Sequence, residues 1–266
     1  ITGGEPLVRK NVSHLIKSLS EIDENLDIAM TTNGYLLSKY ASELHDAGLK
    51  RLTVSLDSLH NEIFKKMSGK NFDVENVLSG IKKAKSEGFE NIKINTVVRK
   101  DVNENSIMDL VDYCRSEGHI LRFIEYMDVG GTRDWNPNQV VFGEEMRRII
   151  ERGIGMLSPV NDSQYGEVAN RWCLEDGYQI GFIESISKPF CNSCTRARIS
   201  ANGSIYTCLF SEHGHDLKSL IKMGAESKDL TDAIASVWGK REDRYSEIRQ
   251  TISSKAKPVQ MHFIGG

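Results

Sequence analysis

Residues 73–98, DVENVLSGIKKAKSEGFENIKINTVV, contain both halves of the unit from which the fold is built. The first half has apolar residues at helical spacing: Val74, Val77, Leu78, Ile81 and Ala84. This spacing predicts an amphipathic helix with one buried face. Gly88 stands where a helix commonly ends, and residues 91–98 are rich in β-branched side chains, which are typical of a strand. The stretch therefore predicts a helix, a glycine cap and a strand in succession.

The same unit recurs on both sides of this stretch. Further helices are expected around residues 38–48 and 107–118, and further strands over residues 26–32, 51–57 and 120–127. Strands that alternate with crossover helices form a parallel sheet. Seven polar residues interrupt these strands: Thr31, Ser55, Asp57, Lys93, Asn95, Arg122 and Glu125. Because strands buried on both faces are usually apolar, the polar residues predict the interior or mouth of a barrel that binds a polar ligand.

The alternation stops after about residue 129, where loop, short-helix and hairpin patterns replace it. Residues 198–208 predict a hairpin, because Asn202-Gly203 supplies the positive φ angles of a tight turn. The last residues have the composition of a mobile tail. We expect three parts: a core barrel over residues 1–129, a second region over residues 130–252 and a tail over residues 253–266.

Three cysteines occur close together in the last third of the chain, at Cys191, Cys194 and Cys208. Thiolates with this spacing are soft ligands for iron or zinc. A structural zinc site has four protein ligands, whereas three thiolates on a four-iron cluster leave one iron open to another ligand. Arg196 and Arg198 lie just after Cys194. Two guanidinium groups beside an open iron predict an anionic ligand, in particular a phosphate.

A closed zinc site is the alternative that the cysteines leave open. His213 would complete a Cys3His set with the three cysteines, and the barrel-like half would then be a binding module and not an enzyme. Thiolate-bound iron gives a brown colour with absorption near ~400 nm, and zinc gives neither. The two remaining cysteines, Cys114 and Cys173, lie beside apolar residues and are expected to be packing residues.

Composition argues against several classes of protein. With 34 Lys and Arg against 37 Asp and Glu, the chain has no basic field that would favour nucleic acid. Five cysteines, an odd number, do not suit a secreted disulfide framework, so a reducing cytoplasm is expected. No apolar run approaches the ~20 residues that cross a bilayer, and no signal peptide opens the chain. Because the chain starts at Ile1 and not at Met, we expect a preceding segment.

Short motifs give the chain a resemblance to a known family. TGGEP at residues 2–6 resembles the glycine-rich motif of radical S-adenosylmethionine enzymes. The further motifs are TTNG at 31–34, SLDS at 55–58, RFIEYM at 122–127 and the clustered cysteines with TRAR at 195–198. Together they make nearly the whole chain similar to the GTP 3′,8-cyclase family. The resemblance implies an α/β fold, a partial TIM-like barrel of parallel βα units with a C-terminal Fe–S-binding extension.

The resemblance also implies a cytoplasmic radical lyase of molybdenum cofactor biosynthesis. In this family a 5′-deoxyadenosyl radical removes the C3′ hydrogen of GTP, and the carbon radical attacks C8 of guanine. The product is (8S)-3′,8-cyclo-7,8-dihydroguanosine 5′-triphosphate. A homodimer is implied, with cyclic pyranopterin monophosphate synthase as the downstream partner. A radical peptide-modifying enzyme remains an alternative, although the cysteine-rich extension of such enzymes usually carries more than three cysteines.

The functional positions of the family carry over to this chain residue by residue. Contacts to S-adenosylmethionine are implied at Gly4, Ser55 and Met127. Contacts to GTP are implied at Thr31, Lys93, Arg196, Ala197 and Arg198, with a further phosphate contact at Arg122. The three clustered cysteines are implied to hold a [4Fe-4S] cluster whose open iron binds guanine. Gly265-Gly266 resemble a tail that reaches into the active site of the family, with a frayed chain end as the alternative.

Two features depart from the family or from regular geometry. Family members carry an N-terminal Cys-x3-Cys-x2-Cys motif whose [4Fe-4S] cluster reduces S-adenosylmethionine, and this sequence has none, so we expect this chain alone not to cleave S-adenosylmethionine. Arg122 and Met127 lie five positions apart and would face opposite sides of a regular strand. Either a bulge intervenes or one of them lies outside the site. Core packing is the alternative for Met127, and a surface position is the alternative for Lys93.

Overall fold

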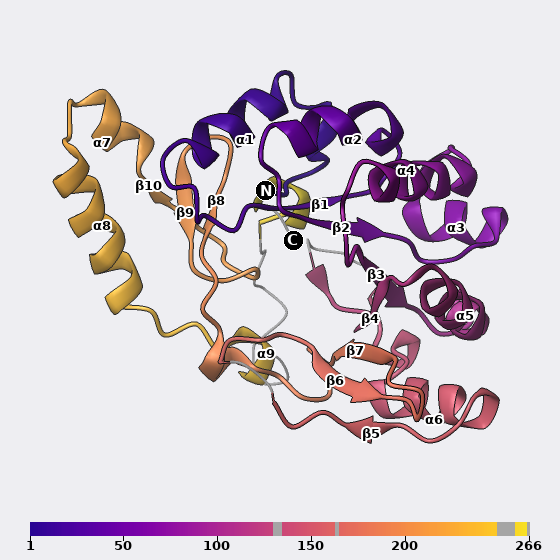
Figure 1. Ribbon diagram of the computed structural model, residues 1–266. Coiled ribbons are helices and arrows are strands. Elements are labelled where there is room, and N and C mark those ends of the chain that lie inside the picture. Colours follow the sequence, from indigo (N-terminus) through magenta and orange to yellow (C-terminus); the bar gives the residue numbers. More distant parts are fainter. Residues whose placement is uncertain (130–134, 163–164, 249–258, 265–266) are drawn as a thin grey trace.

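The computed structural model describes residues 1–129, 135–162, 165–248 and 259–264, which form an α/β fold with one large and one small sheet (Figure 1). The large sheet has the strand order β1-β2-β3-β4-β7-β6-β5. Its strands are β1 Ala29–Thr32, β2 Arg51–Ser55, β3 Lys93–Val98, β4 Ile120–Glu125, β7 Gln179–Ile183, β6 Asn170–Cys173 and β5 Ser158–Pro159. Neighbours from β1 to β7 are parallel, whereas β6 and β5 are antiparallel to their partners. The predicted parallel βα units are confirmed.

Helices cover the outer side of this curved sheet (Figure 1). They are α1 Val12–Ser20, α2 Leu37–Asp46, α3 Asn61–Ser68, α4 Val74–Ser86, α5 Ile107–Glu117 and α6 Gly143–Gly153, with 3-10 turns η1 Pro6–Val8, η2 Glu104–Ser106 and η4 Pro137–Gln139. Helix α4 buries Val74, Val77, Ile81 and Ala84, as its spacing predicts. The short helix α3, between β2 and α4, was not expected from the sequence.

The strands place alternate residues on the two faces of the sheet. In β3 and β4 the pattern puts Ile94, Thr96, Leu121 and Phe123 in the buried layer under the helices. The opposite, concave face carries the partly exposed residues Lys93, Asn95 and Arg122. Backbone pairing places Thr53 beside Lys93, Ser55 beside Asn95, and Asn95 beside Arg122. The concave face therefore collects five of the seven polar side chains predicted to line a barrel.

Two of the predicted interior residues lie elsewhere. Glu125 shares the buried face with Phe123 because both occupy odd positions of β4, so its prediction as an interior residue was wrong. Asp57 follows the end of β2 at Ser55 and belongs to a loop. Strand β4 ends at Glu125, two residues before Met127, so regular alternation does not set the direction of Met127.

The second region continues from the large sheet into the small one. It contains η5 Cys191–Ser193, β8 Arg198–Ile199, β9 Ser204–Tyr206, β10 His215–Asp216, α7 Lys218–Lys222, α8 Ser227–Gly239 and α9 Tyr245–Ile248, and the last described helix is α10 Met261–Ile264. The hairpin of β8 and β9 forms as predicted, but Gly203 alone has a positive φ, of 84°, and Asn202 does not. Gly203 N donates to Ser200 O at 2.9 Å, so a type I turn with a glycine bulge replaces the expected turn.

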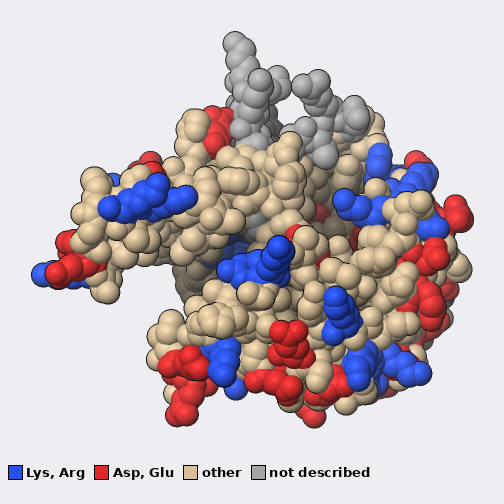
Figure 2. Space-filling model, turned by 90° about the horizontal axis from the view of Figure 1, so that it is seen from above, with Lys and Arg blue, Asp and Glu red and all other residues tan. Residues whose placement is uncertain are grey.

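Helices α7 and α8 project from the body as a separate lobe (Figures 1 and 2). Figure 2 shows basic and acidic residues interspersed over one face of the molecule, as expected from the nearly balanced composition. Within the described part of the chain, no helix has the length and apolar character needed to cross a bilayer.

Candidate functional site

The glycine-rich motif forms a turn that the carboxyl end of β1 holds in place. The Glu5 carboxylate accepts hydrogen bonds from the Leu7 amide at 3.0 Å, from the Thr32 hydroxyl at 2.7 Å and from the Asn33 amide at 2.7 Å. Glu5 therefore fixes the turn that presents Gly4 at the mouth of the sheet. Sequence reasoning quoted Glu5 within the motif but gave it no role, because its partners lie 27 and 28 residues away.

Gly4 also faces the last described helix of the chain. A Cβ added at Gly4 would lie 3.7 Å from the backbone oxygen of His262 in α10. Ile264 of the same helix is buried, with 2% of its surface exposed. The first residues of the chain and α10 consequently lie side by side near the centre of the molecule (Figure 1). Gly265-Gly266 follow directly but lie outside the described residues, so their predicted role stays a prediction.

The concave face of the sheet carries a group of cations. Arg122 Nε donates to Asn95 Oδ1 at 2.9 Å, and the side chain of Arg122 lies over Gly181 in the neighbouring strand β7. A Cβ at Gly181 would approach Arg122 Cγ to 3.0 Å, so a glycine there makes room for the arginine. Among the described residues, neither Arg122 nor Lys93 forms an ion pair.

The electrostatics of this face favour an anion. Burial lowers the pKa of Arg122, and the charge of Arg51 lowers it further. Burial likewise lowers the pKa of Lys93, and the charges of Arg122 and Arg51 add to the effect. Glu167 is the nearby carboxylate that acts in the opposite sense on both groups, and it forms an ion pair with Arg171 at 2.9 Å. A phosphate bound here would relieve the mutual repulsion of the cations.

Other predicted residues of the mouth have more open positions. Ser55, at the end of β2, is exposed, and Thr31 and Met127 are partly exposed. The partial exposure of Met127 leaves its side chain accessible and disagrees with a position deep in the core. Cys114 is fully buried in the core, where burial raises its pKa, and Cys173 lies on β6 with its thiol donating to Leu174 O at 3.3 Å. Cys114 therefore packs as predicted, whereas Cys173 is only partly buried and its packing role stays a prediction.

The clustered cysteines lie on the 3-10 turn η5 and just after β9. All three are partly exposed free thiols, and the Phe210 amide donates to the sulfur of Cys208 at 3.4 Å. Burial would raise the pKa of Cys194, but hydrogen bonds and charge from Arg196, with a hydrogen bond from Arg241, outweigh it and lower this pKa to about 7. A thiol that titrates near neutrality supplies the thiolate that iron binds.

The arginines of the TRAR motif surround these sulfurs. The guanidinium of Arg196 lies 5.2 Å from the ring centre of Phe190, and its buried Nε has no hydrogen-bond partner among the described residues. Burial and the charge of Arg196 lower the pKa of Arg198, whereas the thiols of Cys208 and Cys194 raise it. Ala197, between the two arginines, is exposed. The unpartnered Nε and the crowded cations fit an anionic ligand at this position.

Three thiolates are a donor set whose chemistry suits an iron–sulfur cluster. No group of three or more His, Cys, Asp or Glu side chains among them is placed to hold one ion, and His213 is exposed. The tetrahedral Cys3His site of the zinc alternative is therefore not formed. Each thiolate of a four-iron cluster binds a different iron, so the sulfurs need not converge on one point.

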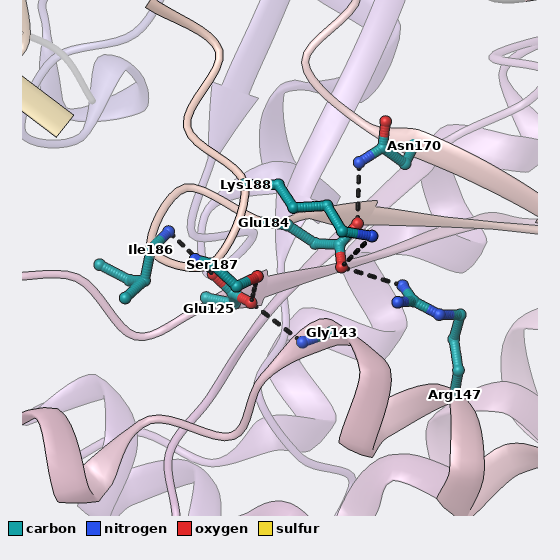
Figure 3. A network of polar contacts seen from close by, with 8 residues as sticks. All are labelled: Glu125, Gly143, Arg147, Asn170, Glu184, Ile186, Ser187 and Lys188. Carbon is teal, nitrogen blue, oxygen red and sulfur yellow. Dashed lines mark hydrogen bonds and ion pairs between the residues drawn. The ribbon is translucent and has the colours of Figure 1, made fainter. Parts of the chain in front are cut away.

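Two contacts join the cysteine-bearing segment, residues 185–197, to the rest of the molecule. The first is at Gly166, in the segment before β6, where φ is +83° and an added Cβ would lie 2.8 Å from the hydroxyl oxygen of Thr195. The second is a network around two buried glutamates, Glu125 and Glu184, at the ends of β4 and β7 (Figure 3). Sequence reasoning missed both contacts, because they depend on packing between segments far apart in the chain.

Two sequence families match adjoining parts of the chain. The family described as Radical SAM superfamily matches residues 1–114, and the family described as Molybdenum Cofactor Synthesis C matches residues 119–247. A GTP 3′,8-cyclase of Xanthomonas campestris pv. campestris (strain B100) is 47% identical over 268 residues, which cover 100% of this chain and 78% of that protein. A GTP 3′,8-cyclase of Staphylococcus epidermidis (strain ATCC 35984) is 44% identical over 271 residues, with 100% and 79% covered. A solved radical SAM methyltransferase from Sphaerobacter thermophilus has a TM-score of 0.45 at 16% identity, covering 57% of this chain and 47% of that one.

Proposed function

The chain belongs to the GTP 3′,8-cyclase family, and from this membership we propose how its residues share the work of the reaction. The protein is a radical S-adenosylmethionine lyase that acts in molybdenum cofactor biosynthesis. Its substrate is GTP, and its product is (8S)-3′,8-cyclo-7,8-dihydroguanosine 5′-triphosphate. The observation that carries the division of labour is the presence of two groups of cations, one on the concave face and one beside the cysteines.

S-adenosylmethionine is held at the mouth of the sheet by Gly4, Ser55 and Met127. Gly4 lets the backbone turn fixed by Glu5 approach the ligand closely. The exposed hydroxyl of Ser55 is free to donate to the ligand carboxylate. When bound, S-adenosylmethionine supplies the 5′-deoxyadenosyl radical that removes the C3′ hydrogen of GTP. The ligands of the [4Fe-4S] cluster that reduces it in this family are not among the five cysteines of this chain.

GTP lies between the sheet and the cysteine-bearing segment. Thr31, Lys93 and Arg122 contact it from the sheet, and Arg196, Ala197 and Arg198 contact it from the segment after η5. Forked guanidinium groups and the lysine ammonium suit the oxygens of a triphosphate. Cys191, Cys194 and Cys208 would hold the [4Fe-4S] cluster, which would supply a binding place for guanine. Fixing both ends of the nucleotide keeps the ribose near the radical source, where contact distance is required.

The wider setting follows from the family. We place the protein in the cytoplasm as a homodimer that passes its product to cyclic pyranopterin monophosphate synthase. The chain divides into a barrel over residues 1–129, a cluster- and GTP-binding region over 130–252 and a tail over 253–266. The contact of His262 with Gly4 supports a tail that reaches the mouth of the sheet.

Nucleotide binding by the iron-loaded chain tests this proposal. After anaerobic reconstitution with iron and sulfide, the sample is brown, and GTP titrated by calorimetry binds and changes the electron paramagnetic resonance spectrum of the reduced cluster. Arg122→Met weakens GTP binding at least about tenfold, equal to ~1.4 kcal/mol. The matched change Lys82→Met, at an exposed position of α4, leaves the GTP affinity unchanged. A cluster-loaded sample that does not bind GTP supports the peptide-modifying alternative, and a colourless zinc-containing sample supports the binding module.

A further inference from the structure

Glu125 is a fully buried carboxylate whose partners are backbone amides and one hydroxyl. None of its surface is exposed. Its Oε1 accepts from the Gly143 amide at 2.9 Å and from the Ser187 hydroxyl at 2.5 Å, and its Oε2 accepts from the amides of Ile186 and Ser187 at 2.8 Å each (Figure 3). No cation among the described residues pairs with it. These charge-assisted hydrogen bonds are strong and directional, so they fix the relative positions of the groups they join.

The three elements that meet at Glu125 are distant in sequence. Glu125 ends strand β4, Gly143 is the first residue of α6, and Ile186 and Ser187 follow strand β7, 61 and 62 residues after Glu125. Cys191 lies only four residues after Ser187. The backbone that leads to the cysteines is therefore held by the sheet immediately before it reaches them.

The neighbouring glutamate makes a different set of contacts. Glu184, with 1% of its side chain exposed, binds Arg147 at 3.1 Å and Asn170 at 2.8 Å. A Cβ at Gly143 would lie 2.4 Å from Glu184 Oε1, so α6 packs directly on this carboxylate. The side chain of Glu184 meets the segment after β7 in an ion pair at 3.4 Å with Lys188, whose side chain is 58% exposed, and the Glu184 backbone oxygen accepts from the Lys188 amide at 2.8 Å. An ion pair to a largely exposed lysine constrains the backbone less than the buried amide hydrogen bonds of Glu125 do.

We propose that Glu125 is a positioning residue that sets where the turn of Cys191 and Cys194 stands relative to the concave face of the sheet. This inference rests on the proposed function, in which GTP is held at both places at once. A ligand gripped at two ends binds tightly only if the two sites are spaced to fit it. A displacement of about 1 Å is enough to matter, since misplacement of this size can lower the rate about 100-fold in reactions that depend on alignment.

The test compares two substitutions at buried carboxylates. Glu125→Gln replaces one acceptor oxygen with an amide that faces N–H donors, and Glu184→Gln makes the same change beside it. Both variants are reconstituted with iron and sulfide, and their iron content and GTP affinity are measured. Guanosine, which lacks the phosphates, is titrated separately while the resonance spectrum of the cluster is followed. The spectral response to guanosine reports binding at the guanine site alone.

We expect the Glu125→Gln variant to bind GTP at least tenfold more weakly while it keeps its iron content and its spectral response to guanosine. Glu184→Gln keeps GTP affinity near that of the parent. Ser187→Ala, which removes only the hydroxyl bond, gives a smaller loss in the same direction and serves if Glu125→Gln does not fold. Unchanged GTP affinity in both Glu125→Gln and Ser187→Ala, or loss of iron together with GTP binding, overturns it. If the parent itself binds no GTP, the proposed function fails instead.

Discussion

We expect Asp57 to make the protein less stable as the pH rises and Asp57→Asn to remove this effect. The carboxyl follows β2, and its Oδ1 accepts from the Val97 amide at 2.9 Å. Burial raises its pKa from 3.8 to about 6, although the Val97 hydrogen bond acts in the opposite sense. Among the described residues no cation pairs with Asp57. Ionisation of the carboxyl at neutral pH is therefore opposed by its surroundings.

The sign and size of the effect follow from proton linkage. The folded-state pKa lies above the unfolded-state value, so the folded protein binds the proton more tightly. This contribution to stability is fully present below pH ~4 and is lost as the pH rises through about 6. At ~1.4 kcal/mol per pH unit, the loss is ~3 kcal/mol. That figure is an upper limit because Asp57 keeps some contact with solvent. Asparagine has nearly the same shape, keeps the acceptor for Val97 and does not ionise.

Urea unfolding followed by circular dichroism measures the difference between parent and Asp57→Asn at several pH values. The two proteins are similar near pH 4, and the variant becomes more stable by up to ~3 kcal/mol at pH 7, with about half of the change below pH 5. Asp112→Asn, on the exposed face of α5, shows how much arises from the loss of any negative charge. A difference between parent and Asp57→Asn that stays constant from pH 4 to pH 8 would refute the reasoning.

Two further substitutions probe the cysteine-bearing segment. Gly166→Ala is expected to lower the free energy of unfolding by ~2–4 kcal/mol, because the positive φ costs ~1–2 kcal/mol and the new methyl group would crowd Thr195. The control is Gly177→Ala, which has a φ of +89° and no atom within 4 Å of the added Cβ, so it costs only the backbone part. Equal losses of unfolding free energy for the two variants in urea would contradict the predicted contact. Arg241→Met removes a hydrogen bond and a positive charge from Cys194. The reduction potential of the cluster should become more negative in a titration followed by electron paramagnetic resonance, because hydrogen bonds to sulfur help set that potential; an unchanged potential excludes this role.

The sequence predicted features that depend on local periodicity. The buried face of α4 follows from the spacing of Val77 and Ile81, and the concave placement of Lys93 and Arg122 follows from the alternation of a strand. The same alternation places Glu125 on the opposite face, so its misassignment came from grouping polar residues without applying strand parity. The periodicity was sufficient to correct it.

Other features depend on contacts that no local pattern contains. Glu5 binds residues 27 and 28 positions away, and the crowding of Gly166 against Thr195 arises only after two loops pack together. The turn at Asn202-Gly203 was predicted as a hairpin, but the conformation of Asn202 was wrong, because the bulge is set by pairing of Ser200 with Ser204. Such contacts require the folded chain.

The way the cysteine-bearing segment is attached to the sheet bears on how the site stays aligned. A substrate held at both ends needs two regions that do not drift apart, and the ion pair of Lys188, whose side chain is largely exposed, adds little to this restraint. The buried amide contacts of Glu125 and the close packing of Gly166 on Thr195 both hold this segment. Because removal of one buried hydrogen bond costs more than loss of an exposed ion pair, alignment should be most sensitive to these two positions. Under the proposed function, sites remote from the cations therefore control how tightly the cations would hold GTP.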